Sequence, residues 1–327
     1  MPPPNSQRVA VVLLNLGGPD SLAAVEGFLF NLFSDPDIFK LPLARFTQRP
    51  FARLIARRRA PEATHGYAAI GGASPLLANT ERQARALEAA LPLERFKVFV
   101  CMRYWHPLTE EVVETLKREG FSRVLLLPLY PQYSTTTTGS SFNEFTRQCR
   151  RQAYAPTLRR IERWYERPRF VQAIAAAIER ARAEFGEPDP GKISLLFSAH
   201  GLPQKIVDAG DPYEREIQAT YRAVCQQLGW PDTTLCYQSR VGPLKWLTPY
   251  TEDTIRQKAA AGVQQILVYP IAFVSDHIET LFELGMTYAD LARSLGVREY
   301  RVVPALNDDP ALIETLRELV LEHSDGV

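Results

Sequence analysis

Ile193-Ser194-Leu195-Leu196-Phe197-Ser198-Ala199-His200-Gly201-Leu202-Pro203 is a short apolar run that ends in a polar turn. Its apolar part is too short for a helix and lacks the alternation of a half-exposed strand, so it predicts a strand covered on both faces. In open α/β sheets, ligands collect at the carboxyl ends of the strands. His200 therefore stands where a binding or catalytic side chain is expected.

Similar apolar runs recur along the chain, with helical patterns between them. This alternation predicts open, parallel α/β sheets. The other strands are expected at Val9–Leu14, Val98–Cys101, Val124–Leu127, Leu235–Tyr237 and Ile266–Tyr269. Helices are expected at Thr109–Glu119, Phe170–Phe185, Tyr213–Leu228, Thr251–Ala261 and Ala311–Glu322.

The two halves of the chain repeat one layout. A strand ending near Arg103 is followed by His106-Pro107 and a helix, and a strand ending near Arg240 is followed by Thr248-Pro249 and a helix. We therefore predict two similar lobes that face each other across a cleft. Their expected extents are residues 1–147 with 306–327, and residues 148–305.

Composition narrows the class of protein. The 38 basic and 37 acidic residues among 327 nearly cancel, which argues against a nucleic-acid-binding protein. The four cysteines lack CxxC spacing, so we expect neither a zinc site nor a disulfide framework, as is usual in a reducing cytoplasm. No run approaches the roughly 20 apolar residues of a transmembrane helix. We expect a cytoplasmic protein.

A group of acids follows the strand at Ile266–Tyr269. At about 100° per residue, Asp276, Glu279 and Glu283 would share one face of a helix. Such a stripe offers oxygen ligands to a hydrated divalent cation, with Glu279 and His200 as inner ligands. The alternatives are a capping box for Asp276 and Glu279, a solvated Glu283, and a structural role for His200.

A basic and apolar stretch runs from Phe28 to Arg59, with no acid between Lys40 and Ala60. This composition suits a surface that meets lipid headgroups or holds an apolar dianion, and it also fits an ordinary amphipathic helix pair. The hydroxyl-rich run at 130–141 fits either an anion site or turn and capping groups.

Seven motifs, in order between Val11 and Leu284, resemble the ferrochelatase family. The resemblance implies two Rossmann-like lobes that hold a porphyrin between them. It also implies insertion of Fe²⁺ into protoporphyrin IX to give protoheme, the last step of heme biosynthesis. The motifs are Leu14–Pro19, Gly71–Pro75, Arg103–Pro107, Tyr130–Ser134, Ser198–Pro203, Gln238–Pro243 and Ser275–Thr280.

The resemblance also assigns roles to single residues. It places His200 at the metal and pyrrole centre, Glu279 opposite it as the second catalytic and metal-binding group, and Glu283 in an acidic relay leading away. Arg59 matches a position that grips a propionate. The positions that match the porphyrin pocket are Leu16, Tyr67, Ser74, Arg103, Tyr130, Trp246 and Phe273.

The chain departs from family members that carry an iron–sulfur cluster. No cysteine follows Cys236, and Thr135 stands where those members place a cysteine. We therefore expect no cluster and no cofactor beyond the substrate Fe²⁺. The Leu16 motif and the long stretch at 28–59 resemble the protoporphyrin-using branch more than the coproporphyrin-using one.

Two mechanisms fit these residues equally well. In one, His200 accepts the pyrrole protons while Fe²⁺ arrives from the Glu279 side; in the other, the metal arrives at His200 and protons leave through Glu279 and Glu283. Rival functions are a coproporphyrin ferrochelatase, a cobalt or nickel tetrapyrrole chelatase, and a non-catalytic tetrapyrrole-binding protein. We further expect peripheral membrane contact through residues 28–59.

Overall fold

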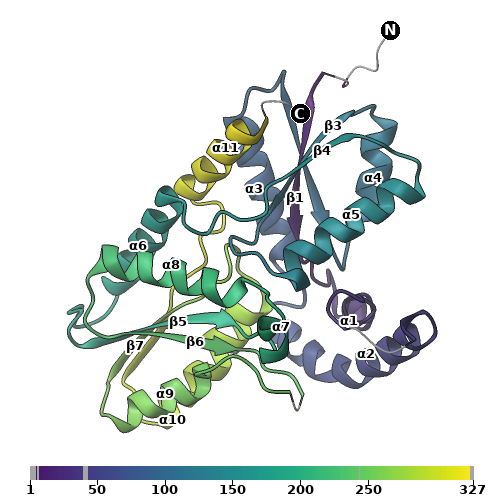
Figure 1. Cartoon of the computed structure of the whole chain (residues 1–327). Coiled ribbons are helices and arrows are strands. Elements are labelled where there is room, and N and C mark those ends of the chain that lie inside the picture. The colour runs from purple at the N-terminus through teal and green to yellow at the C-terminus, as the bar shows by residue number, and fades with distance from the viewer. Residues whose placement is uncertain (1–4, 6, 40–42, 243, 325–327) are drawn as a thin grey trace. The chain divides into compact units, whose positions relative to one another are not determined.

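The computed structural model describes residue 5 and residues 7–39, 43–242 and 244–324. The chain forms two compact units, Met1–Arg163 with Ile313–Val327, and Trp164–Leu312. Each unit holds its own four-stranded parallel sheet flanked by helices, as Figure 1 shows. The fold class predicted from the sequence is confirmed.

The first sheet has the strand order β2-β1-β3-β4. The predicted strands are present as β1 (Val9–Asn15), β2 (Phe96–Met102) and β3 (Arg123–Pro128). The edge strand β4 (Thr157–Arg160) was not predicted, because its Thr-Leu-Arg-Arg sequence carries no apolar run. A polar edge strand is common, since water satisfies one of its sides.

Helices cover both faces of this sheet. Ala10, Val12 and Leu14 of β1 pack with apolar side chains of α4 and α5, whereas α3 contacts β1 and β2. The short helix η1 (Leu22–Ala24) leads into the α1–α2 hairpin. The helices of this unit are α1 (Val25–Phe33), α2 (Ala44–Ala69), α3 (Leu76–Ala90), α4 (Thr109–Arg118), the π-helix η2 (Thr135–Gly139) and α5 (Ser140–Arg151).

The second sheet repeats this topology, with the order β6-β5-β7-β8. Its strands are β5 (Ile193–His200), β6 (Thr233–Gln238), β7 (Gln265–Tyr269) and the unpredicted edge strand β8 (Glu299–Val302). The helices are α6 (Pro168–Arg182), α7 (Gln204–Asp208), α8 (Tyr213–Leu228), α9 (Thr251–Ala260), the π-helix η3 (Glu279–Thr287) and α10 (Tyr288–Ser294).

The repeat seen in the sequence is present in detail. The Met102 N–H donates to the Pro107 carbonyl at 2.8 Å, and the Tyr237 N–H donates to the Pro249 carbonyl at 2.9 Å. Both prolines follow cis peptide bonds, and in both units a π-helix follows the third strand. The final helix α11 (Pro310–Ser324) returns to the first unit, where Arg317 Nε donates to the Ala90 carbonyl at 3.1 Å.

Candidate active site

His200 is the last residue of β5, at the carboxyl edge of the second sheet. The Tyr213 hydroxyl donates to the His200 carbonyl at 2.9 Å, which fixes the backbone where the strand ends. The imidazole is 40% exposed, although the strand before it is buried. A reactive side chain at the end of a rigid strand is therefore accessible to a ligand.

Glu279 meets His200 directly. It is the first residue of η3, which follows β7, and β7 is the sheet neighbour of β5. Its Oε2 lies 2.8 Å from His200 Nδ1. The two residues with the central roles in the sequence analysis are thus brought into contact, because adjacent parallel strands end at the same edge of a sheet.

The environment shifts both residues toward their charged forms. Burial acts to lower the pKa of His200, but the charge and hydrogen bond of Glu279, together with the charge of Glu283, outweigh it and raise the pKa. Burial acts to raise the pKa of Glu279, but the charge and hydrogen bond of His200 outweigh it and hold the pKa well below its usual range. The Glu279 carboxylate therefore stabilises the imidazolium that forms when His200 takes up a proton, and that imidazolium in turn stabilises the ionised Glu279.

A second carboxylate is tied to the first by Ser239, just beyond β6. The Ser239 hydroxyl donates to Glu279 Oε2 at 3.1 Å and makes a very short hydrogen bond to Glu283 Oε2. Its backbone N–H donates to Glu283 Oε1 at 3.0 Å, and the Tyr288 hydroxyl donates to the same oxygen at 3.0 Å. Sequence reasoning missed Ser239 and Tyr288, although Ser239 follows a predicted strand.

Glu283 differs from Glu279 in its protonation tendency. Burial and the neighbouring charge of Glu279 raise the pKa of Glu283, because two close carboxylates resist being charged together. One acid is thus held ionised and the other is disposed to carry a proton. Divergent acid strengths in neighbouring groups are characteristic of acid–base sites.

Asp276 does not belong to this acidic group, which corrects the expectation of three carboxylates on one face. The regular helix begins only at Glu279, so the 100° periodicity does not extend back to Asp276. Asp276 Oδ2 instead accepts a 2.7 Å hydrogen bond from Asn307 Nδ2, and the Asp276 N–H donates to Asn307 Oδ1 at 2.9 Å. This reciprocal pair anchors the turn that precedes η3.

Two aromatic residues, Phe273 and Trp246, lie near the end of β5. Phe273 has its ring centroid 6.4 Å from that of His200 and 4.3 Å from that of His277. His277 is buried, and burial lowers its pKa, so its imidazole is held neutral. Trp246 packs at Gly201, where an added Cβ would lie 3.2 Å from the indole. Predicted pocket residues Phe273 and Trp246 are therefore near the His200 strand end.

Three other predicted pocket residues gather after β1 in the first unit. Leu16 follows the end of that strand, and Gly18 approaches Ser74 so closely that a Cβ on Gly18 would lie 2.4 Å from the Ser74 hydroxyl oxygen. The same Cβ would lie 3.8 Å from the Tyr67 hydroxyl. The Ser74 N–H donates to the Pro19 carbonyl at 2.8 Å. Only glycine permits this approach.

The remaining predicted residues of the first unit are placed differently. Arg59 lies on α2, where its Nε is 3.3 Å from Glu62, and Tyr130 follows β3, where burial raises its pKa. Arg103 is 11% exposed, and its guanidinium Nη2 lies 2.9 Å from Asp35 Oδ2. The Arg103 charge is thus already paired within the protein.

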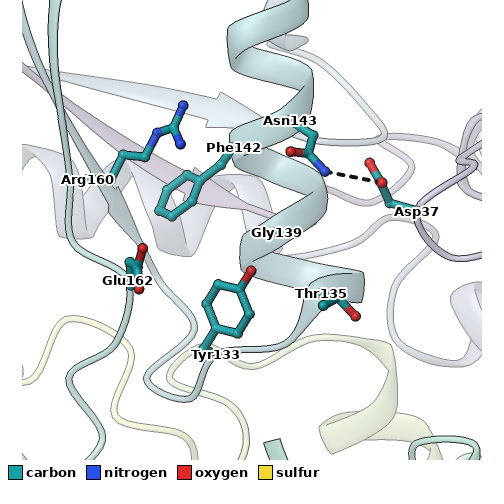
Figure 2. Close-up of a pocket in the computed structure, with 8 residues that line it drawn as sticks. All are labelled: Asp37, Tyr133, Thr135, Gly139, Phe142, Asn143, Arg160 and Glu162. Atoms are coloured by element: carbon teal, nitrogen blue, oxygen red, sulfur yellow. Dashed lines mark hydrogen bonds between the residues drawn. The ribbon is translucent and has the colours of Figure 1, made fainter. Parts of the chain in front are cut away.

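Thr135, which replaces a cluster cysteine in the resemblance, lines a cavity of about 270 Å³ (Figure 2). The Asn143 amide donates to Asp37 at the rim, 3.2 Å away. No cysteine is among the residues that line it. The lining residues are Asp37, Tyr133, Thr135, Gly139, Phe142, Asn143, Arg160 and Glu162.

Within residues 5, 7–39, 43–242 and 244–324, no group of three or more His, Cys, Asp or Glu side chains is arranged to hold a metal ion. His200 and Glu279 are a pair of potential donors, and they contact each other through Nδ1 and Oε2.

Comparison with known proteins gives one consistent result. The family model described as ferrochelatase matches residues 8–324. A ferrochelatase of Synechococcus sp. (strain JA-3-3Ab) is 50% identical, with 97% of this chain and 94% of the relative covered. A ferrochelatase of Geotalea daltonii is 48% identical, with 96% of this chain and 98% of the relative covered.

The solved structures add evidence on the fold. SirB from Bacillus subtilis with Fe³⁺ superposes with a TM-score of 0.58 at 8% identity, covering 97% of this chain and 96% of SirB. At that identity the likeness concerns the arrangement of strands and helices alone. The family assignment depends on the matched family model and on relatives at about half identity over almost the full length. This chain belongs to the ferrochelatase family.

Proposed function

We propose that this chain is a protoporphyrin ferrochelatase, a lyase that inserts Fe²⁺ into protoporphyrin IX to give protoheme. Family membership supplies the reaction, with porphyrin and iron as substrates. We assign the reaction to His200 and Glu279 because His200 Nδ1 lies 2.8 Å from Glu279 Oε2.

His200 acts as the base that receives the pyrrole protons. Glu279 is a carboxylate and can only accept, so Nδ1 of the neutral imidazole carries the proton and Nε2 keeps its lone pair. A proton taken up at Nε2 produces an imidazolium, which the charge of Glu279 stabilises. A carboxylate that orients and stabilises a histidine base serves the same role in many enzymes.

Glu283 provides the next proton acceptor. Metal insertion releases two protons from the porphyrin, and a single imidazole binds only one at a time. Glu283 has a raised pKa and is joined to Glu279 by the Ser239 hydroxyl. The hydrogen-bonded order His200, Glu279, Ser239, Glu283 supports a route by which a proton leaves His200. His200 is then free to accept the second pyrrole proton. The direct His200–Glu279 bond favours this assignment over metal delivery at His200.

The porphyrin is held by the residues that match the family pocket. Burial of the apolar macrocycle edge and pairing of the propionates supply binding energy, which can be used to bend the ring and expose the pyrrole lone pairs. We assign Arg59 to a propionate, and Leu16, Tyr67 and Ser74 to the ring. Trp246 and Phe273, which also match the family pocket, are assigned to the ring as well.

Substrate choice is tested by one comparison. Wild-type protein is mixed anaerobically with Fe²⁺ and each of protoporphyrin IX, coproporphyrin III and sirohydrochlorin, and the visible spectrum is followed. We expect metal insertion to be fastest with protoporphyrin IX. Faster insertion into either of the other two would replace the protoporphyrin assignment, and binding without any spectral change would show a non-catalytic protein.

We also propose that the α1–α2 hairpin contacts a membrane surface. Leu43, just before α2, is 77% exposed, Phe46 and Leu54 on α2 are 73% and 66% exposed, and arginines lie along this helix. Such a surface fits anionic lipid headgroups. Among the helices that the structure describes, none has both the length and the apolar character of a membrane span.

Vesicle sedimentation tests this contact. The double variant Phe46→Ser with Leu54→Ser should lose binding to anionic vesicles, whereas Leu93→Ser, at an exposed leucine of the loop after α3, should not. Equal binding by all three proteins would refute the proposal.

Finally, we propose that the enzyme works without an iron–sulfur cluster. Burial raises the pKa of Cys101 and Cys236 to about 12, which disfavours the thiolate that a cluster requires. Thr135 offers a hydroxyl where cluster-bearing relatives have a thiol. Anaerobically purified protein should lack cluster absorption in the visible range while retaining full insertion activity. Stoichiometric iron and sulfide in active protein would contradict this.

A further inference from the structure

The α2 helix is held in place mainly by α1. Along most of its length α2 buries only a narrow stripe, formed by Gln48, Ala52 and Ala56 at a spacing of four residues. This stripe faces α1, and Gln48 Nε2 donates to the Phe33 carbonyl at 3.0 Å. The position of α2, and of Arg59 on it, therefore depends on how α1 is fixed to the rest of the first unit.

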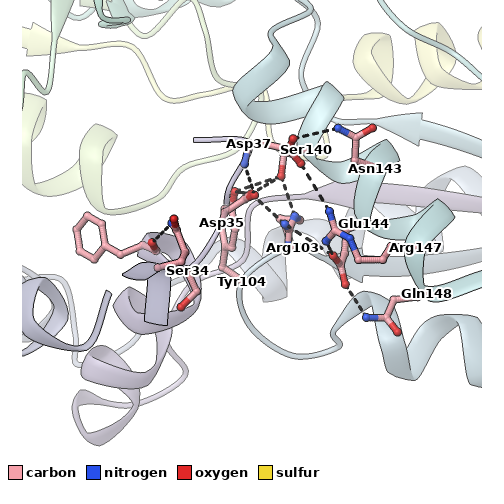
Figure 3. Close-up of polar contacts among 12 residues, drawn as sticks. Ser34, Asp35, Asp37, Arg103, Tyr104, Ser140, Asn143, Glu144, Arg147 and Gln148 are labelled. Carbon is pink, nitrogen blue, oxygen red and sulfur yellow. Dashed lines mark hydrogen bonds and ion pairs between the residues drawn. The ribbon is translucent and has the colours of Figure 1, made fainter. Parts of the chain in front are cut away.

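Asp35, two residues beyond the end of α1, is the buried point of that attachment. Its side chain is completely inaccessible to solvent. The Tyr104 hydroxyl donates to Asp35 Oδ2 at 2.6 Å, and the Ser140 hydroxyl makes a very short hydrogen bond to the same oxygen. Arg103 Nη2 lies 2.9 Å from it. Figure 3 shows these side chains converging on Asp35 from two separate segments of the chain.

Arg103 depends on Asp35 in turn. Its Nε donates to the Ser140 hydroxyl at 2.8 Å, and its guanidinium lies over the Tyr104 ring, 4.9 Å from the centroid. Glu144 is farther away, at 3.9 Å. Removing the Asp35 charge would leave a nearly buried cation without its close partner, and such a loss is far more disruptive than losing an exposed ion pair.

Weaker contacts surround this centre. Asn31 Nδ2 donates to the Tyr104 carbonyl at 3.0 Å, and Asn143 Nδ2 donates to Asp37 at 3.2 Å. Arg147 lies 3.9 Å from Asp37, and its side chain is exposed. These contacts join the same three segments, namely the chain after α1, the chain after β2, and α5. Asp35 is the buried residue at the centre of this group of contacts.

We infer that Asp35 is a positioning residue for porphyrin binding: it fixes the end of α1, and thereby sets where α2 presents Arg59 and how Arg103 is oriented. Asp35 itself need not touch substrate. The inference rests on the proposed function, because Arg59 is assigned there to a propionate and Arg103 matches a position of the family's porphyrin pocket. It predicts an effect on porphyrin affinity rather than on the insertion step.

The test is the Asp35→Asn variant, which keeps the side-chain shape and removes the charge. We expect the KM for protoporphyrin to rise about tenfold, the kcat to stay within about twofold, and the KM for Fe²⁺ to stay unchanged, because uniform substrate binding is lost while the chemistry is intact. A general loss of folded enzyme would lower kcat and leave KM alone. A porphyrin KM within about twofold of wild type would overturn the inference.

Two further variants keep the result interpretable. Tyr104→Phe removes only one donor to Asp35, and we expect a porphyrin KM raised about threefold even if Asp35→Asn folds poorly. Glu26→Gln is the matched control, since Glu26 joins α1 to Arg57 of α2 through an exposed pair 3.4 Å long. Its kinetics should equal those of wild type. Equal shifts in Glu26→Gln and Asp35→Asn would refute a special role for Asp35.

Hydrogen exchange separates this inference from the proposed function. Without any substrate, Asp35→Asn should exchange backbone amides of residues 44–69 faster than wild type and Glu26→Gln do. Unchanged exchange there would overturn the inference even if the enzyme is a ferrochelatase. Failure of the wild-type protein to insert iron would instead refute the proposed function.

Discussion

The backbone N–H of Ser239 donates a 3.0 Å hydrogen bond to Oε1 of Glu283, while the hydroxyl of the same serine bonds to the other oxygen of that carboxylate. Ser239 holds a left-handed backbone conformation with φ of 64°, which is uncommon for a residue with a Cβ. That conformation brings the N–H and the hydroxyl of Ser239 to the same carboxylate. The hydroxyl oxygen also lies 3.1 Å from Glu279 Oε2, so this serine links the two carboxylates.

Removal of that link should slow insertion without weakening porphyrin binding. We expect Ser239→Ala to lower kcat by about tenfold to a hundredfold with an unchanged porphyrin KM, since it loses the hydroxyl near the reacting groups. Ser239→Gly loses the same hydroxyl but relieves the backbone strain. Steady-state kinetics should therefore give similar kcat values for both variants. Full activity in the glycine variant would assign the effect to backbone strain instead.

The imidazole of His200 should titrate above the ordinary histidine value. Its raised pKa means that pairing with Glu279 stabilises the fold fully below a pH of about 6.5 and less as the pH rises through the raised pKa. The lowered pKa of Glu279 acts in the other direction: its contribution is present above the ordinary glutamate value and is lost as the pH falls toward the lowered value.

Glu283→Gln provides the direct check of this titration. The charge of Glu283 contributes to raising the pKa of His200, so its removal should lower that pKa. Nuclear magnetic resonance of the His200 ring would measure it in both proteins, with Glu252→Gln as a control at an exposed acid of α9. An increase of the His200 pKa in Glu283→Gln would contradict the electrostatic account.

The pair formed by Asp276 and Asn307 should stabilise the second unit. Asn307→Asp replaces the 2.7 Å amide donor by a second carboxylate, so we expect a loss of about 1–3 kcal/mol in the free energy of unfolding. Thermal unfolding measures this, with Asp308→Asn as an adjacent exposed control. An Asn307→Asp midpoint equal to that of the control would show that the pair is not important.

Gly18 should be sensitive to a single added methyl group. In Gly18→Ala the new Cβ would lie 2.4 Å from the Ser74 hydroxyl oxygen, so Ser74 must move. We expect porphyrin affinity to fall, with a loss of stability of about 1–3 kcal/mol from overpacking. Gly186→Ala is the control, because its Cβ would meet only Glu299, at 3.6 Å. Porphyrin titration measures the affinity of both variants. Equal affinities would count against a role for Ser74 in porphyrin binding.

Much of the fold was predictable because the buried strands are encoded by local apolar runs. All six such runs form strands, and the repeated turns at Pro107 and Pro249 adopt matching hydrogen bonds. The edge strands β4 and β8 were not predictable in this way, since their sequences are polar or mixed and their pairing depends on a neighbour already in place.

The contact between the two central candidate residues was predictable, and the contacts around them were less so. His200 and Glu279 follow neighbouring strands, and the rule that parallel strands end at one edge places them together. The position of Asp276 depended on where the helix begins, which the periodicity did not reveal. Ser239 was missed because a serine becomes informative only when its unusual backbone conformation is known.

The role of His200 as the proton-accepting base is tested most directly by His200→Ala in the anaerobic insertion assay, with protoporphyrin binding measured in the same samples. The variant should bind porphyrin with nearly wild-type affinity and show no spectral change when Fe²⁺ is added. Insertion at a rate close to that of wild type would remove His200 from the reaction and contradict the mechanism.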